Sequence, residues 1–488
     1  MSPLIKRFTW GLILFQMFFW TLVPWVSHHA PPLDATEMYG WSLSFEWGFY
    51  KHPPMPPWIV AIVQSIVGKN MFSLFLCASL AISATYYAVA WLASQFLDEK
   101  ESVVALFLYA LTIYCHLWST DFNHNQIQMT FWAWSLLFLY KTLQTKSLSL
   151  AFVLGAMMGL NALSKYTAAF IVPCALMLLI FSKPWREQVN LKIFTVTTLG
   201  FLLVFGPHLW WLTQHDFMPF HYVSERFDEL DQSKSNLLSL LDYVGNTFIA
   251  HLFLWIAAAF CVVKFKSKGS GFLTSKGIEF QTLKNKQFLI YLGLGPFLLS
   301  CVIGIWVPLY YRWATPMLPM LTIVLAYFLR GRLNHLFQKK YIIAFIIIQF
   351  IFGIVYVGKA SFNKNSNRGN YPAPEIAQMV HKNWQTLYPN SPLRIVAGGE
   401  WEAGFISLFN TGKIYVFTQA DYQLAPWVQP DLVKNCGMVM IWPSQKELNQ
   451  FPDAKVQAPI VIPANSLYQE VKISWASQAP QGKCDKIK

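Results

Sequence analysis

The sequence predicts a polytopic α-helical membrane protein that carries a small α/β soluble domain at its C-terminal end. Of the 488 residues, 55% are hydrophobic and only 12% are charged, whereas soluble globular chains have about 25% charged residues. Apolar runs close to the roughly 20 residues that cross a bilayer recur from residue 8 to residue 358. Short β-rich runs between polar stretches follow, as in a soluble domain. We therefore predict a transmembrane domain at residues 1–358 and a soluble domain at residues 359–488.

The apolar runs indicate about eleven transmembrane helices. The first, residues 8–26, follows Lys6 and Arg7 and has no small-residue cleavage site, so we expect a retained span rather than a signal peptide. The run at residues 58–67 is too short to cross and is expected to lie at the interface as an amphipathic helix. The later spans with the clearest bounds are predicted at residues 71–96, 103–118, 191–211, 237–263, 288–307 and 341–357.

The positive charges indicate the orientation of these spans. Within residues 1–358, 18 Lys and Arg lie in the segments that alternation places in the cytoplasm, including the basic loop at residues 264–286, and 6 lie elsewhere. Cytoplasmic loops of membrane proteins carry such an excess. The net charge of +13 is therefore explained by topology and membrane lipids rather than by nucleic acid. We predict a cell inner (plasma) membrane protein with a cytoplasmic N-terminus and an extracytoplasmic C-terminal domain, entered through a linker at residues 358–374.

The seven cysteines include no CxxC pair, so the sequence indicates neither a zinc ribbon nor a thioredoxin-type site. Five lie in apolar runs, as structural core residues do. Cys436 and Cys484 are the two in the polar tail, and they could form a disulfide if that tail faces an oxidising compartment.

Polar residues collect at the predicted outer ends of several spans, where one cavity could hold them. Charged groups near apolar spans are costly and tend to be functional. The acidic members, from the first two outer loops, are Asp34, Glu37 and Asp121. The other members come from the end of the first loop and from later loops, and they are Lys51, His52, Lys165, Tyr166 and Arg312.

These residue types suit a transfer from a phosphate to a hydroxyl group. A carboxylate can take a proton from an attacking hydroxyl group, and Lys or Arg can hold a departing phosphate. Each residue also has an ordinary structural explanation. Asp34 follows two prolines as a helix N-cap residue often does, and Lys165 and Arg312 stand where interfacial anchors stand. The outer histidines lack a tight metal-ligand spacing, and a metal stays an open question.

Four stretches resemble the GT-C membrane glycosyltransferases, and in particular the branch of aminoarabinose transferases and protein O-mannosyltransferase-like enzymes. They are LDATEMYGWS followed by GFYKHPPMPPW in the first loop, STDFN, GLNALSKYTA and YYRWATPMLP, and they span about residues 1–330. The resemblance implies an acceptor-activating Asp34 with Glu37 beside it, and a second acid at Asp121. It also implies a donor phosphate held by His52, with Lys51, Lys165 and Arg312 as further candidates. Tyr166 is a candidate for a separate reason, because an aromatic ring near the headgroup level can stack on a sugar or an isoprene unit.

The sequence departs from these relatives at one position. Many of them carry an acid immediately before the His or Lys of the Pro-Pro motif, where this chain has Lys51. This puts in question a divalent metal held by Asp34 and Asp121, and it suggests an added cation for the phosphate. No other cofactor is indicated.

The leading hypothesis is thus an inverting glycosyltransferase of the periplasmic face. It would move a monosaccharide from a polyprenyl-phosphate donor to an envelope acceptor, which is lipid A or core saccharide, another glycan, or protein. The absence of a Gly-rich nucleotide-binding loop agrees with a lipid-carried donor. Two alternatives remain. One is a transporter or flippase for a lipid or amphipathic solute, for which His251 inside a span is a candidate residue. The other is a scaffold without catalytic activity.

Overall fold

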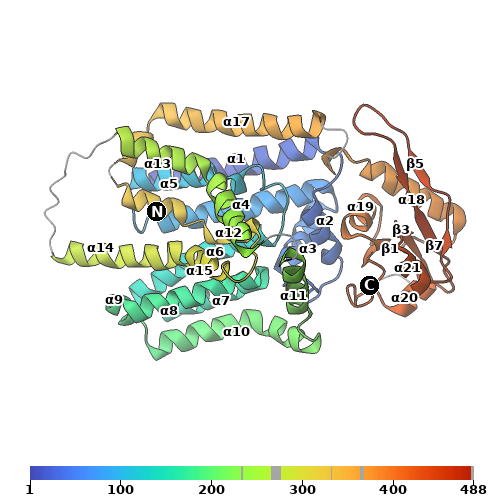
Figure 1. The fold of residues 1–488 in the computed structure, drawn as a ribbon, viewed down its shortest axis with the longest axis horizontal. Helices are drawn as coiled ribbons and strands as arrows, with labels where there is room; N and C mark the ends of the chain where they lie inside the picture. Colours follow the sequence, from blue (N-terminus) through green and yellow to red (C-terminus); the bar gives the residue numbers. More distant parts are fainter. Residues whose placement is uncertain (232–234, 265–275, 331, 363–367, 485–488) are drawn as a thin grey trace.

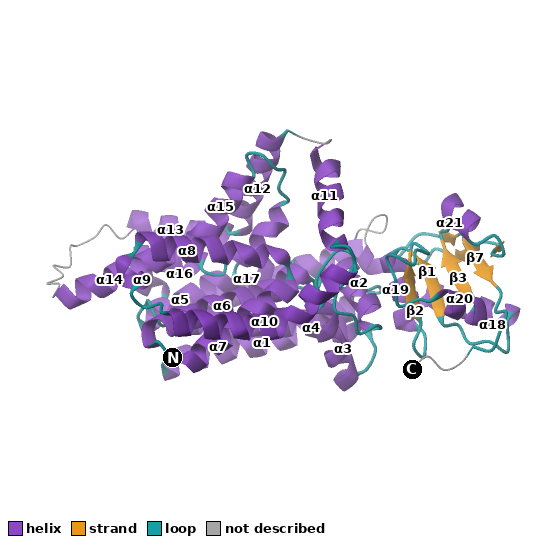
Figure 2. Ribbon diagram, turned by 90° about the horizontal axis from the view of Figure 1, so that it is seen from below, coloured by secondary structure: helices purple, strands orange, loops and turns teal. Residues whose placement is uncertain are grey.

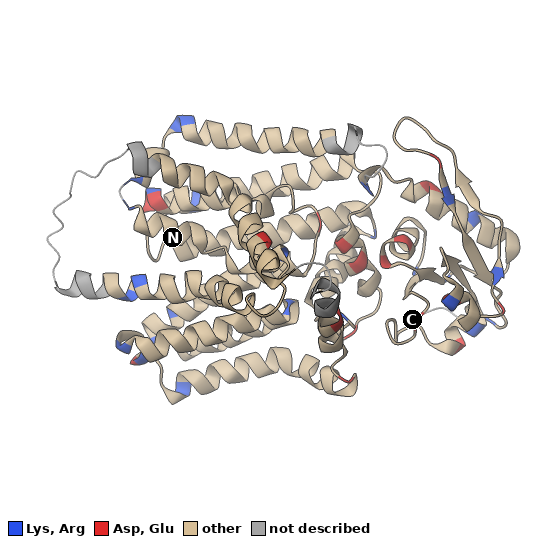
Figure 3. Cartoon of the chain, viewed as in Figure 1, with Lys and Arg blue, Asp and Glu red and all other residues tan. Residues whose placement is uncertain are grey.

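A computed structural model of the chain describes residues 1–231, 235–264, 276–330, 332–362 and 368–484. Residues 265–275 of the predicted basic loop and 363–367 of the predicted linker lie outside the described residues. Long helices run side by side in a bundle, and the C-terminal sheet with its helices stands at one end of that bundle (Figure 1). Lys and Arg mark the bundle ends that point away from the sheet (Figure 3).

Most helices of the bundle lie in the predicted apolar runs, with two differences. The second half of the predicted basic loop is helical from residue 276, and the helix predicted at residues 103–118 ends at Ala110. The helices of the bundle are α1 (Pro3–Ser27), α4 (Met71–Ala93), α5 (Glu99–Ala110), α6 (His124–Thr145), α7 (Leu148–Ser164), α8 (Ile171–Phe181), α9 (Lys183–Arg186), α10 (Leu191–Gln214), α12 (Asn236–Ala250), α13 (Leu252–Lys264), α14 (Lys276–Phe288), the π-helix η3 (Leu289–Leu294), α15 (Gly295–Ile303), α16 (Leu321–Phe328) and α17 (Lys339–Phe362). Three further helices lie toward the C-terminal domain: α2 (Leu33–Ser42), α3 (Met55–Val67) and α11 (Met218–Asp231).

The protein is embedded in a membrane, and its predicted polytopic helical class is confirmed. Within the described ranges, five helices are long and apolar enough to cross a bilayer, or six if a bent pair counts as one span. That pair corrects the predicted continuous span at residues 237–263, because α12 and α13 meet at a 64° bend. Several other apolar helices, such as α8 and α16, are shorter than a bilayer crossing. The total of eleven spans stays a prediction.

Glycines allow α7 and α10 to pack backbone against backbone. A Cβ atom on Gly155 would lie 2.0 Å from the carbonyl oxygen of Thr197, and one on Gly200 would lie 2.4 Å from that of Phe152. Gly159 continues the same face of α7 one turn later, so the two form a G-x-x-x-G motif. Small residues of this kind let membrane helices approach closely, and here they fix the helix that leads to Lys165.

Replacing Gly155 with Ala is therefore expected to destabilise the bundle, because the new methyl group would push α7 and α10 apart. We expect a loss of about 1–3 kcal/mol, measured as a lower thermal midpoint of the detergent-solubilised protein. Gly206→Ala on α10 is the matched control, since a Cβ atom there meets nothing within 4 Å. Equal melting temperatures of the two variants would contradict the close packing.

The C-terminal region forms a mixed sheet with helices against it (Figure 2). Its five-stranded sheet has the order β2-β1-β3-β7-β4, in which β1 pairs in parallel with β2 and β3, and β7 pairs antiparallel with β3 and β4. Strands β5 and β6 form a separate antiparallel pair. The strands are β1 (Ile395–Gly398), β2 (Tyr415–Thr418), β3 (Met438–Ile441), β4 (Lys455–Val456), β5 (Ile460–Ile462), β6 (Val471–Ile473) and β7 (Trp475–Gln478). The helices are α18 (Ala373–Leu387), α19 (Glu400–Phe409), α20 (Pro430–Cys436) and α21 (Gln445–Gln450).

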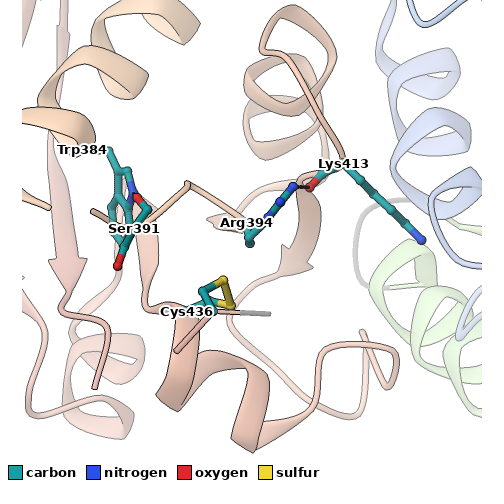
Figure 4. The surroundings of a disulfide bond; sticks show 6 residues. Trp384, Ser391, Arg394, Lys413 and Cys436 are labelled. Carbon is teal, nitrogen blue, oxygen red and sulfur yellow. Dashed lines mark hydrogen bonds between the residues drawn. A yellow bond between two sulfur atoms is a disulfide. The ribbon is translucent and has the colours of Figure 1, made fainter. Parts of the chain in front are cut away.

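The two cysteines of the tail form a disulfide, Cys436–Cys484, which ties the last described residues to the end of α20 (Figure 4). The sequence left this pairing open. On the same domain, the indole of Trp384 donates a hydrogen bond to the Ser391 carbonyl oxygen at 2.8 Å, which closes the turn between α18 and β1.

Helix α19 docks the C-terminal domain onto α2. A Cβ atom at Gly404 would lie 2.5 Å from the Thr36 side chain, so only glycine allows this approach. The Trp401 indole donates to the carbonyl oxygen of Pro31 at 2.9 Å. Lys69, between α3 and α4, donates to carbonyl oxygens at the C-terminal end of α19, including that of Ser407 at 2.9 Å. A cation is favourable at that end of a helix. The first outer loop and the C-terminal domain are thus held in one arrangement.

Candidate active site

A cavity of about 670 Å³ lies where the bundle meets the C-terminal domain. The predicted site residues Asp34, Glu37, Lys51, His52, Lys165, Tyr166 and Arg312 line it. Asp121 stands directly behind Asp34, as its hydrogen bonds show. The cavity also contains residues that the sequence analysis did not name: Asn123, His124, Asn125, Phe220, Tyr222, Trp313 and Glu400. Residues far apart in the chain therefore share one space, although their roles stay predictions.

Asp34 stands in the first turn of α2, two residues after Pro32, which occupies the N-cap position. Its Oδ2 atom accepts a hydrogen bond from the Asn123 side chain at 3.0 Å. Asp121 accepts a hydrogen bond from the Ala35 backbone at 2.9 Å and another from the backbone of Asp34. Asp121 thereby caps the start of α2. This arrangement holds Asp34 in place and leaves its carboxylate on the cavity wall.

The two carboxyl groups have different environments. Burial raises the pKa of Asp121 to about 8, with a further contribution from the charge of Asp34, while backbone hydrogen bonds and Arg312 oppose the rise. Asp121 therefore binds a proton near neutral pH more readily than an ordinary aspartate. This difference suits a reaction in which Asp34 accepts a proton and Asp121 holds Asp34 in position.

Two cations lie on the cavity wall without a carboxylate ion pair in the described part of the chain. Lys165, at the end of α7, donates to Asn125 Oδ1 at 2.7 Å and lies 5.7 Å from the Trp313 ring centroid. Arg312 belongs to the 3-10 helix η4 (Tyr311–Met317), and its guanidinium carbon lies 5.5 Å from the Trp118 ring centroid. The Arg312 Nε atom is buried without a hydrogen-bond partner among the described residues. A buried unsatisfied donor is costly, which is reason to expect an anion there.

Lys51 has a different environment from the one the sequence suggested. Its Nζ atom donates to Glu37 Oε1 at 2.6 Å and to Glu400 Oε2 at 2.7 Å. Glu400 also accepts a hydrogen bond from the Tyr50 hydroxyl group at 2.7 Å. Two carboxylates thus occupy the Lys51 ammonium group, which is a weaker candidate for a phosphate contact than Lys165 or Arg312. Glu37 is likewise bound to Lys51 and is a weaker candidate for a base than Asp34.

The charges around Lys51 set the protonation of this group. Burial by itself lowers the pKa of Lys51, but Glu37 and Glu400 outweigh it and raise this pKa. Burial and the charge of Glu400 raise the pKa of Glu37 well above its usual value. Burial also tends to raise the pKa of Glu400, but hydrogen bonds from Glu37, Lys51 and Tyr50 and the Lys51 charge lower it overall.

His52 is also less suited to a charge role than the sequence suggested. Burial, together with His124, Lys165 and Lys51, lowers its pKa well below the usual value, so its imidazole is neutral. Its ring centroid lies 4.0 Å from that of His124. A neutral His52 can supply a hydrogen bond to a phosphate but no positive charge.

Tyr166 supplies an aromatic part of the wall. Its hydroxyl group lies 3.0 Å from His208 Nε2, and its ring stacks on Phe220 with the centroids 4.9 Å apart. An aromatic face of this kind can stack on a sugar ring or pack against an isoprene unit.

The donor set around Asp34 and Asp121 does not fit a resident metal ion. The Asp121 carboxyl group accepts hydrogen bonds from backbone amides of α2, and the Asn123 side chain donates a hydrogen bond to Asp34. Within the described ranges, no group of three or more His, Cys, Asp or Glu side chains could hold a metal ion. We derive no reaction step through a metal.

Comparisons with known proteins agree with this architecture. Residues 51–211 match the family described as dolichyl-phosphate-mannose-protein mannosyltransferase. The chain is 28% identical over 185 residues to the lipid A galacturonosyltransferase RgtD of Rhizobium johnstonii, a match covering 38% of this chain and 39% of the relative. It is 22% identical over 425 residues to the lipopolysaccharide core galacturonosyltransferase RgtB of the same organism, covering 85% of this chain and 83% of the relative.

The whole fold resembles a solved structure. ArnT from Cupriavidus metallidurans, bound to undecaprenyl phosphate, superposes with a TM-score of 0.62 at 12% identity, over 97% of this chain and 98% of that one. The chain therefore has the fold of the GT-C membrane glycosyltransferases. The sequence matches agree, and they confirm the resemblance that the outer-loop motifs predicted. The matched part of RgtD is less than half of that relative's length.

Proposed function

We propose that the protein is an inverting glycosyltransferase that moves a monosaccharide from a polyprenyl phosphate to a glycolipid of the cell envelope. The observation that carries the proposal is one cavity whose wall holds the carboxylate of Asp34 together with Lys165 and Arg312, two cations without a carboxylate ion pair among the described residues. The relatives RgtD and RgtB act on lipid A and lipopolysaccharide core, as their names state, and ArnT binds undecaprenyl phosphate. These facts favour lipid A or core saccharide as the acceptor over protein.

The proposed reaction is one displacement at the anomeric carbon. Asp34 takes the proton from the acceptor hydroxyl group as its oxygen bonds to this carbon. The bond from the carbon to the phosphate oxygen breaks on the opposite face, so the configuration inverts. Arg312 and Lys165 stabilise the negative charge that develops on the departing phosphate. Asp121 keeps Asp34 in position through the first turn of α2, and Tyr166 packs against the donor.

Two observations support an extracytoplasmic site in the inner membrane. Lys and Arg gather at the bundle ends away from the C-terminal domain, as they do on the cytoplasmic side of membrane proteins (Figure 3). The Cys436–Cys484 disulfide favours an oxidising compartment for the domain that borders the cavity. This topology leaves the N-terminus of α1 in the cytoplasm. We propose the same two domains, although α17 continues past the predicted boundary at residue 358 to Phe362.

The test is transfer by the purified protein in lipid nanodiscs. Polyprenyl phosphates that carry galacturonic acid, aminoarabinose or mannose would be offered with lipid A, core saccharide or an unfolded protein as acceptor. The proposal expects a glycolipid product whose mass increases by one sugar and whose new linkage is inverted. The same protein would also be reconstituted in sealed vesicles. Movement of the lipid across the vesicle membrane with no product would favour the transporter alternative, which the relatives reported above do not support.

The pH dependence of donor capture is expected to follow Lys165. Burial lowers the pKa of this residue to about 7, with Asp34 opposing the shift. Lys165 is thus charged below about pH 7 and neutral above it. The kcat/KM for the anionic donor should then fall as pH rises above about 7, by up to about tenfold per pH unit.

Lys165→Arg is the matched variant for this prediction, because the guanidinium group stays charged over the whole range. The kcat/KM of this variant should not fall above pH 7, whatever its absolute value. A fall of the same size in both proteins would assign the titration to another group. Stopped-assay profiles of kcat/KM between pH 5.5 and 9 distinguish the two results.

A further inference from the structure

Glu400 reaches the cavity from the C-terminal domain. Strand β1 ends at Gly398, and α19 begins two residues later with Glu400. Strands β2 and β3 lie on either side of β1, both parallel to it. The carboxyl ends of such strands are where α/β domains present functional groups. Here that end of the sheet faces the membrane domain, and Glu400 is the residue of the C-terminal domain found in the cavity lining.

The side chain of Glu400 makes specific contacts inside the cavity. One carboxylate oxygen accepts from Lys51 Nζ at 2.7 Å, and the other accepts from the Tyr50 hydroxyl group at 2.7 Å. The exposed fractions of the Glu400 and Lys51 side chains are 16% and 18%. Charge-assisted hydrogen bonds with so little solvent access hold their partners firmly. Both oxygens of Glu400 are therefore committed to two neighbouring residues of the first outer loop.

These contacts constrain the Lys51 ammonium group, which lines the same cavity as Asp34. Glu37 and Glu400 take two of its three N–H donors, which leaves one for the cavity. Without Glu400, the Lys51 side chain would have one carboxylate partner and could turn toward the carboxylate of Asp34 or the donor phosphate. An ion pair between Lys51 and Asp34 would weaken the base.

The position of Glu400 is itself fixed by the docking of α19. Next to it, Trp401 donates to the Pro31 carbonyl oxygen. At the other end of the helix, Tyr39 and Ser407 share a hydrogen bond of 2.9 Å, and Lys69 donates to the Ser407 carbonyl oxygen. Both ends of α19 are thus tied to the membrane domain, so its first residue has a defined place in the cavity.

We propose that the C-terminal domain completes the active site, and that Glu400 is a positioning residue that holds Lys51 and Tyr50 in their working arrangement. This inference rests on the proposed glycosyltransferase function. It gives the domain a direct part in the transfer rather than only a stabilising one.

The test compares Glu400→Gln with Glu402→Gln in the full-length protein. Both changes remove one negative charge from the first turn of α19, but Glu402 is not part of the cavity lining. We expect Glu400→Gln to lower kcat by about 10- to 100-fold, as misplaced catalytic groups do, with a much smaller change in donor KM. Glu402→Gln should transfer at the wild-type rate. Glu402→Gln should melt at the wild-type temperature. Glu400→Gln should melt lower, because it removes one partner of a buried ion pair, so kcat is compared at a temperature where all three proteins are folded.

A double-variant cycle with Lys51→Met separates positioning from general destabilisation. If Glu400 acts through Lys51, adding Glu400→Gln to Lys51→Met should cost much less than it costs in the wild type. An equal cost in both backgrounds, or wild-type kcat in Glu400→Gln, would overturn the positioning role. A wild-type protein inactive with every polyprenyl-phosphate donor would instead overturn the proposed function. The two failures are thus distinguishable.

Discussion

Asp34→Asn is expected to lower kcat by about 10²- to 10⁴-fold, the usual cost of losing a general base. Asparagine has nearly the same shape, so the first turn of α2 and the backbone contacts of Asp121 should persist. The amide cannot take the proton of the acceptor hydroxyl group. Donor KM should change little, because the cations that hold the phosphate remain. Initial rates with a labelled polyprenyl-phosphate sugar measure both constants.

The control for this variant is Asp216→Asn, which removes a carboxylate from a solvent-exposed position between α10 and α11. It should be as active as the wild type. An Asp34→Asn protein that retains more than about a third of the wild-type kcat would remove Asp34 from the role of base. Asp121, whose raised pKa makes it a proton carrier near neutral pH, would then be the next residue to substitute.

Arg312→Ala should lower kcat by about 10²- to 10³-fold, as the removal of a group that stabilises developing charge does. The Nε atom is buried without a hydrogen-bond partner in the described part of the chain, so one donor of the guanidinium group is available to an anion. We expect the affinity for undecaprenyl phosphate, measured as product inhibition, to fall as well. Arg312→Lys should recover only part of the rate, because an ammonium group lacks the bidentate geometry.

Arg330→Ala is a suitable comparison, because Arg330 follows α16 at its far end and lies outside the cavity lining. Its loss removes the same charge, from a site where the guanidinium group stacks on Tyr327 at 4.2 Å. Transfer by this variant should match the wild type. A similar loss of kcat in both arginine variants would indicate a general effect of charge on the folded protein rather than phosphate binding.

The sequence sufficed to predict the helical bundle and the gathering of outer-loop residues. Apolar runs set the helix positions because a bilayer fixes their length and composition. Charged residues at the outer ends of those runs are excluded from the apolar part of the bilayer, so we expected them to gather in a shared polar cavity outside it. Asp34, Lys165 and Arg312 were found in this way, although they come from three separate parts of the chain.

The environment of each residue could not be predicted in the same way. Lys51 was expected to face a phosphate, but its partner Glu400 lies 349 positions further along the chain. Only the docking of α19 on α2 brings the two together. The neutral state of His52 likewise depends on burial among other basic groups, which no local pattern reveals. A Gly-Gly-Glu sequence directly after a β-rich run is a local signal that could have identified Glu400.

The helix bend at His251 was also beyond the sequence pattern. Residues 237–263 form one apolar run, and neither proline nor a glycine pair marks the break between α12 and α13. The His251 side chain instead bonds back to the Thr247 carbonyl oxygen at 2.8 Å. A side-chain hydrogen bond to the helix backbone therefore accompanies the break, and the apolar pattern does not reveal it.

The interface between α2 and α19, here called the seam, determines how the C-terminal domain can be studied by deletion. Truncating the chain before residue 373 would expose Thr36, which packs against Gly404. It would also remove the hydrogen bond from Trp401 to the Pro31 carbonyl oxygen and the one from Lys51 to Glu400. An inactive truncated enzyme would follow whether or not the domain ever touches an acceptor. Acceptor binding by this domain has to be assigned with single substitutions on its surface, in a chain that retains both halves of the seam.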